Sequence, residues 1–142
     1  MTGDVLLDTH IALWLESGDD RLRRNTQRLI EGCWRDGGSI LLSAVSVWEI
    51  AQLVHRGRIE LLRPLDEWVD RFIDRPGVSI LPLSHRSASR AYRLDGLAHA
   101  DPADRLLISA SIERGCPLVT YDARIIQFGE TYGAGCGFVA LG

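Results

Sequence analysis

The chain has 142 residues, 46% hydrophobic and 25% charged, values that are ordinary for a single globular domain spanning residues 1–142. All sixteen basic residues are arginine, which excludes chemistry that needs a lysine ammonium, such as Walker A phosphate binding or Schiff-base catalysis. The formal net charge of −3 gives no overall attraction to nucleic acid, although arginines can still bind individual phosphates. No apolar run approaches the ~18 residues of a membrane span and no signal peptide is recognisable, so we expect a cytoplasmic protein without membrane contact.

Short apolar runs alternate with stretches of helical periodicity along the first half of the chain. The apolar runs predict buried strands, and apolar residues spaced three or four apart predict helices. In chain order these are a strand over 3–7, helices over 10–17 and 20–35, a strand over 39–43 and a helix over 44–56.

The same alternation continues to the end of the chain. The pattern predicts a helix over 64–74, a strand at 78–81, helices over 84–94 and 103–114, a strand at 117–120, a helical turn at 122–127 and a last strand near 137–141. Alternating strands and helices favour an α/β fold of three layers, with a mainly parallel sheet of four or five strands and helices on both faces.

Several residue types carry only weak functional signals. The three cysteines are odd in number and share no CxxC spacing, which predicts free structural thiols in a reducing compartment. The histidines have no HExxH spacing, which disfavours zinc; they are His10, His55, His85 and His99. The tryptophans lie in predicted helices and are expected in the core; they are Trp14, Trp34, Trp48 and Trp68.

Polar side chains follow three of the predicted strands directly. Asp8 follows the first strand, Ser43 the second, and Thr120 and Asp122 follow the strand at 117–120. Ligands of a parallel α/β sheet bind outside the carboxyl ends of its strands. These side chains are therefore expected near one another at one edge of the sheet.

Two further acids lie on apolar stripes of predicted helices. Glu49 has Val45 and Leu53 four residues away on either side, and Asp104 precedes Leu107 and Ile108 by three and four residues. Both carboxylates should face the core side, where an unpaired charge is costly.

Each acid also has an ordinary structural interpretation. Asp8 and Asp101 suit helix N-caps, Asp104 suits the first turn of a helix, Asp122 suits a turn, and Glu49 could pair with an arginine. Taken together, however, four acids are predicted to converge on one end of one sheet: Asp8, Glu49, Asp104 and Asp122. Such hard oxygen ligands suit Mg²⁺ or Mn²⁺.

A group of arginines lies on the predicted helix over 84–94. Arg86, Arg90 and Arg93 recur at roughly helical spacing. They form either a solvated face or a strip that contacts phosphates.

Four segments, in order, resemble the successive motifs of PIN-domain proteins, and most closely VapC-type toxins of bacterial type II toxin–antitoxin pairs. They are VLLDTHIALW, SAVSVWEIAQLVHRGRIEL, DPADRLLISASIERG and LVTYDARI. By position, Asp8, Glu49 and Asp104 match the first three acids of the family and Asp122 the more variable fourth. Asp101 matches an additional acid of the DPxDR subgroup, and Thr9 and Ser43 match positions that often support the site.

The resemblance implies a PIN fold and cleavage of RNA by a water molecule that Mg²⁺ or Mn²⁺ activates. Arg105 would contact phosphate or form an outward salt bridge. The implied partners are the RNA substrate, a small antitoxin that wraps across the active site, and a second copy of the chain. Two other functions stay open at this point: an RNA-processing nuclease without a toxin role, and a catalytically silent PIN-like binding module.

Overall fold

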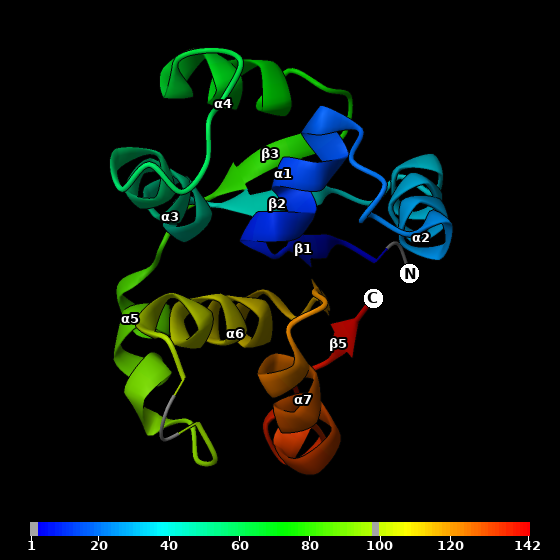
Figure 1. Cartoon of the computed structure of the whole chain (residues 1–142). Coiled ribbons are helices and arrows are strands. Elements are labelled where there is room, and N and C mark those ends of the chain that lie inside the picture. Colours follow the sequence, from blue (N-terminus) through cyan, green and yellow to red (C-terminus); the bar gives the residue numbers. More distant parts are fainter. Residues whose placement is uncertain (1–2, 98–99) are drawn as a thin grey trace.

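The computed structural model describes residues 3–97 and 100–142, which form a five-stranded, all-parallel sheet between layers of helices (Figure 1). The strands are β1 (Val5–Leu7), β2 (Ile40–Ser43), β3 (Val78–Leu81), β4 (Leu118–Val119) and β5 (Ala140–Leu141), in the order β3-β2-β1-β4-β5. Strand β1 is central, with β2 on one side and β4 on the other. The crevice at such a reversal of strand order is where open α/β sheets bind ligands.

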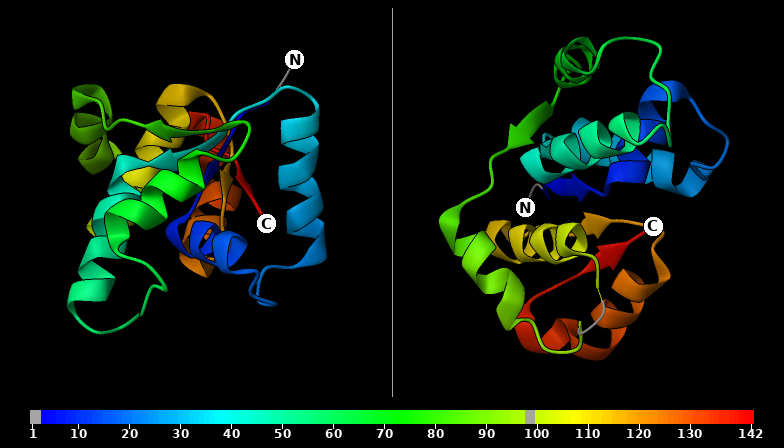
Figure 2. Two further views of the ribbon diagram at one scale, coloured as in Figure 1. Left: turned by 90° about the horizontal axis from the view of Figure 1, so that it is seen from above. Right: turned by 60° about the vertical axis from the view of Figure 1, so that its left-hand side comes forward.

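Helices connect successive strands and cover both faces of the sheet. They are α1 (Thr9–Ser17), α2 (Arg24–Arg35), α3 (Ala44–His55), α4 (Leu65–Ile73), α5 (His85–Arg90), the 3₁₀ turn η1 (Ala91–Arg93), α6 (Pro102–Arg114) and α7 (Ala123–Cys136). Helices α1, α2 and α4 lie on one face and α6 and α7 on the other, as the two further views confirm (Figure 2). None of the described helices combines the length and apolarity needed to span a bilayer.

The alternation of side chains along β1 builds two separate cores. Val5 and Leu7 pack on the face of α1, α2 and α4, whereas Leu6 packs on the face of α6 and α7. All three are almost fully buried, and burying a side chain of this size contributes about 1.5–3 kcal/mol. The apolar runs of the central strands are therefore continuous because both faces are covered, and the predicted three-layer α/β fold is confirmed.

Two predicted helix boundaries are wrong. Residues 19–22 form a turn in which the Asp19 carboxylate accepts a hydrogen bond from the Arg21 backbone N–H at 2.8 Å, so α2 begins only at Arg24. Helix α7 runs on to Cys136 instead of ending near 127, despite its glycines. Glycine is needed there for packing, because a Cβ at Gly133 would lie 2.4 Å from the Phe138 carbonyl oxygen.

The expectation that the tryptophans are core residues is wrong for two of them. Trp68 is buried and Trp14 half-buried, but Trp34 is 48% and Trp48 58% exposed. Trp34 covers a turn, where a Cβ at Gly77 would meet its ring at 2.4 Å. Free thiols are confirmed for all three cysteines, Cys33, Cys116 and Cys136.

Candidate active site

Asp8 lies where β1 ends and α1 begins, and both of its carboxylate oxygens have partners. Oδ1 accepts a hydrogen bond from the Thr9 backbone N–H at 2.8 Å, and Oδ2 accepts one from the Thr120 hydroxyl at 2.7 Å. The side chain is only 8% exposed. Burial raises the pKa of Asp8 above its usual value, against the opposing effect of these two hydrogen bonds. Asp8 is thus both the predicted helix cap and a buried carboxylate at the edge of the sheet.

Glu49 is joined to this site through a threonine hydroxyl. The Thr9 side chain donates a hydrogen bond to the Glu49 carboxylate, and its oxygen also lies 3.0 Å from the Ser46 hydroxyl. Burial raises the pKa of Glu49, the hydrogen bond from Thr9 opposes this shift, and the charge of Asp8 adds to it. Thr9 therefore ties the start of α1 to α3 through its hydroxyl.

Asp104 carries the largest electrostatic perturbation in the site. It lies in the first turn of α6, and burial together with four neighbouring carboxylates raises its pKa to about 7. These neighbours are Asp8, Asp122, Asp101 and Glu49, in decreasing order of effect. The five acids predicted from the sequence are therefore close enough to repel one another, although they belong to four different helices: α1, α3, α6 and α7.

The remaining acids cap helices at the same edge of the sheet. Asp101 accepts from the Ala103 backbone N–H at 2.8 Å, with Pro102 in the first helical turn, and stays exposed. Asp122 accepts from the backbone N–H groups of Arg124 at 2.9 Å and Ile125 at 3.2 Å. Asp122 begins a long helix instead of standing in an isolated turn.

Thr120 links two of the acids. Its buried hydroxyl donates to Asp8 and accepts from the backbone N–H of Asp122 at 3.0 Å. Ser43 has a different role, because its hydroxyl accepts from the Val45 backbone N–H at 3.0 Å and caps α3. Ser43 thereby fixes the start of the helix that carries Glu49.

The donor chemistry of this site fits a divalent cation. Its ligands are carboxylate oxygens, and the charges that raise the pKa of Asp104 are other carboxylates, so a bound cation would relieve their repulsion. Within residues 3–97 and 100–142, no three acidic, histidine or cysteine side chains already form a closed ligand group. The acids thus influence one another's ionisation but are not arranged as a closed group of ligands. Of the four histidines, His99 lies outside the described residues.

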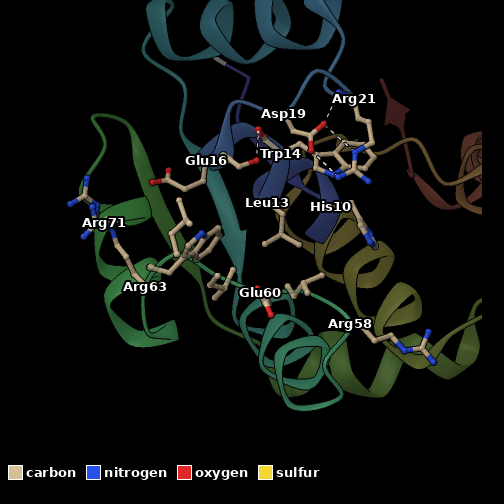
Figure 3. Close-up of a pocket in the computed structure, with 15 residues that line it drawn as sticks. His10, Leu13, Trp14, Glu16, Asp19, Arg21, Arg58, Glu60, Arg63 and Arg71 are labelled. Carbon is tan, nitrogen blue, oxygen red and sulfur yellow. Dashed lines mark hydrogen bonds and ion pairs between the residues drawn. The ribbon is translucent and has the colours of Figure 1, made fainter.

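A cleft of about 610 Å³ lies between α1 and the connection from α3 to α4. Figure 3 shows His10 and Trp14 on α1, with Arg58, Glu60 and Arg63 on the connection. His10 is the residue of this cleft that lies near the acids, because it contributes electrostatically to the pKa of both Asp8 and Glu49. The proximity of His10 to these acids is not predictable from the sequence, because the spacing of the histidines does not indicate which carboxylates they approach.

Arg105 corrects one expectation. The side chain is only 9% exposed, and its guanidinium donates to the backbone carbonyl oxygens of Ala91, at 3.1 Å, and Leu97. An outward salt bridge is therefore wrong, and the donors of Arg105 are directed into the protein instead of towards a substrate phosphate. Arg86 and Arg90, in contrast, are exposed on α5.

Comparisons with known proteins agree with this fold. The family model described as the PIN domain matches residues 5–131. Ribonuclease VapC22 from Mycobacterium tuberculosis is 32% identical over 121 residues, which cover 85% of this chain and 88% of that protein.

Solved structures with the same fold are components of protein complexes. VapBC2 from Rickettsia felis, bound to a DNA fragment from the promoter, aligns with a TM-score of 0.63 at 15% identity over 96% of each chain. A toxin–antitoxin complex from Klebsiella pneumoniae aligns with a TM-score of 0.57 at 18% identity, again over 96% of each chain. The family-model match and the 32% identical relative show that this chain belongs to the PIN-domain family.

Proposed function

We propose that this chain is an Mg²⁺- or Mn²⁺-dependent endoribonuclease and the toxin of a type II toxin–antitoxin pair. The observation that carries the proposal is the group of coupled carboxylates at the carboxyl end of β1, where Asp104 has a pKa of about 7. The 32% identity to a protein named as a ribonuclease supports RNA as the substrate.

Asp8, Glu49 and Asp104 would hold the ion, with Asp122 and Asp101 contributing further negative charge. When bound, such an ion opposes the negative charge that develops on a phosphodiester and makes a water molecule more acidic. Thr120 and Thr9 orient Asp8 and Glu49 through their hydroxyls, so these residues hold the ligands in place.

We infer two protein partners. Toxin–antitoxin complexes among the structural neighbours support a cognate antitoxin, and the cleft beside His10 offers it both apolar and charged side chains. The 58% exposed Trp48 on α3 supports a homodimer, because a large apolar side chain gains from burial against a second copy. Free thiols support a cytoplasmic location.

Metal binding is tested by thermal unfolding with and without Mn²⁺. A ligand that binds only the folded state raises the melting temperature, so wild-type protein should be stabilised by saturating Mn²⁺. Asp8→Asn should reduce this shift strongly, and an unchanged shift in that variant would exclude the proposed metal site. Cleavage of RNA should require the same ion.

The toxin role is tested in cells. Induced expression should arrest growth, and co-expression of the neighbouring upstream open reading frame should relieve the arrest. A nuclease that cleaves RNA in vitro but causes no arrest would instead be an RNA-processing enzyme. Sequencing of RNA 5′ ends shortly after induction would identify the cleaved RNA.

A further inference from the structure

A strip of positive charge lies on the surface of α5 and η1, outside the group of acids. The basic strip consists of His85, Arg86, Arg90 and Arg93, all exposed, which line a shallow hollow of about 310 Å³ with Ser89. None of its arginines takes part in the ion pairs found among the described residues. Three guanidinium groups are therefore oriented towards solvent on one short segment.

Glu113, an acid on which the charges of this strip act, is already engaged by other donors. The Glu113 carboxylate on α6 accepts hydrogen bonds from the hydroxyls of Ser84 at 2.6 Å and Ser87 at 2.5 Å. These bonds lower the pKa of Glu113 first, and the charges of Arg90 and Arg86 add to the effect. One engaged carboxylate does not neutralise three arginines, so the strip keeps a net positive charge even with the exposed Asp95 beyond it.

Hydrogen bonds hold α5 and η1 along α6, and Asp104 lies in the first turn of that helix. The Ser109 hydroxyl donates to the Ser87 carbonyl oxygen at 2.7 Å, and Arg105 holds the carbonyls of Ala91 and Leu97. The start of α5 thus contacts the C-terminal part of α6, and the residues after α5 contact its N-terminal part. The two segments therefore run antiparallel. Because Arg105 adjoins Asp104, the strip leads from the far end of α6 to the active site.

An exposed aromatic ring is placed among these arginines. Tyr92 lies between Arg90 and Arg93 in the sequence and is 71% exposed. The Arg105 guanidinium lies 5.1 Å from the centre of its ring. Most of the ring therefore remains accessible, and such rings stack on nucleobases without regard to sequence.

We propose that the basic strip and Tyr92 bind the phosphate backbone and one base of single-stranded RNA and guide it towards the acid cluster. This inference rests on the proposed ribonuclease function. Bidentate guanidinium groups suit phosphate oxygens, and an exposed ring beside them suits an unpaired base. An acidic protein segment would use the arginines but has no need for the ring.

The test compares two double variants that lower the net charge equally. Arg86→Gln with Arg90→Gln removes two charges from the strip, and Arg28→Gln with Arg35→Gln removes two exposed charges from α2. Binding of fluorescent single-stranded RNA to the whole chain is measured by anisotropy in EDTA, so that no RNA is cleaved. The strip variant should bind about tenfold more weakly, and its salt dependence should fall by about 1.4 in log–log slope. The α2 variant should bind like wild type.

Equal binding by the two variants would overturn the proposal, as would a strip variant that binds RNA normally but loses its antitoxin. Tyr92→Leu, which keeps an apolar side chain, should weaken binding about fivefold without altering the salt slope.

Cleavage assays separate this inference from the proposed function. If RNA binds the strip but is never cleaved, the ribonuclease function is refuted and RNA binding by the strip still holds. If the strip variant cleaves RNA with an unchanged KM, RNA binding by the strip is refuted and the ribonuclease function still holds.

Discussion

The two ends of β1 each carry an aspartate, and the two side chains have opposite electrostatics. Asp4, at the amino end, accepts hydrogen bonds from the Ser39 backbone N–H at 2.8 Å and from the Arg114 guanidinium at 2.8 and 3.2 Å. These partners lower its pKa. At the carboxyl end, burial raises the pKa of Asp8, and the nearby Asp122 adds to the increase.

The difference separates an acid with a complementary partner from acids that repel one another. Asp4 is stabilised by an arginine and joins β1 to α6, whereas the acids around Asp8 repel one another, which lowers the stability of the folded chain. Residue type and strand are the same in both cases. What differs is whether the neighbouring charges are complementary, and this distinguishes a stabilising contact from a site that favours a ligand.

The largest expected effect is on catalysis. Asp104→Asn should lower RNA cleavage by about 100-fold or more, because it removes a charge from the proposed metal site. Asp4→Asn should leave cleavage close to wild type, because that carboxylate is at the other end of the strand. Cleavage rates at saturating Mn²⁺ give the comparison, with circular dichroism to check folding. Equal losses in both variants would remove the distinction between the two ends.

Loss of the Thr120 hydroxyl should have the next largest effect. Thr120→Val keeps the shape of the side chain but deprives Asp8 and the Asp122 backbone N–H of their buried partner. The free energy of unfolding should fall by about 1–3 kcal/mol, and cleavage should also decrease. Urea denaturation measures the first effect. A variant as stable as wild type would show that this hydroxyl does not support the site.

The pH dependence of stability should be opposite for the two ends. The pKa of Asp104 is about 7 in the folded chain, above its unfolded value, so folding takes up protons and metal-free stability falls as the pH rises from about 4 to 7. Asp104→Asn should flatten this decrease by about 1–2 kcal/mol, less than the full shift because the side chain is partly exposed. Denaturation midpoints across this pH range give the difference between wild type and variant. Parallel pH profiles would contradict the proposed repulsion.

Asp4 should contribute in the acid range instead. Its pKa is lowered on folding, so its contribution is present at neutral pH and is lost as the pH falls through the folded value.

The smallest effect is expected at the amino end of β1. Arg114→Gln removes an ion pair whose side chains are 43% and 25% exposed, so the free energy of unfolding should fall by less than about 1 kcal/mol. Cleavage should not change. Chemical denaturation at neutral pH measures this loss, and a marked decrease in cleavage would mean that Asp4 and Arg114 act on the active site.

Much of the architecture could be predicted from local pattern. The apolar runs ending at Leu7, Ser43 and Val119 are strands, and the acids beyond them lie at one edge of the sheet. One helix boundary was predicted wrongly where a tertiary contact outweighs the local sequence pattern. The helical turn expected at 122–127 runs on to Cys136, and Gly133 within this helix is required by the close approach of Phe138.

The direction of charged side chains was less predictable than the position of strands. Arg105 lies on the helix of Asp104, and helical periodicity alone does not say that carbonyl oxygens of Ala91 and Leu97 will receive its guanidinium. Likewise, a solvated face and an RNA-binding strip have the same sequence spacing. Only the tertiary structure shows that α5 runs along α6 towards the end of that helix where Asp104 lies.

The sequence by itself determined the alternation of strands and helices and the identity of the acids, because hydrophobic periodicity and helix capping act over a few residues. The tertiary structure decided how those acids interact. The hydrogen bonds from Thr9 to Glu49 and from Thr120 to Asp8 join residues 40 and 112 positions apart in the chain. Burial and charge at such contacts depend on which segments the parallel sheet brings together, and this is why Asp4 and Asp8 differ although the same short strand carries both.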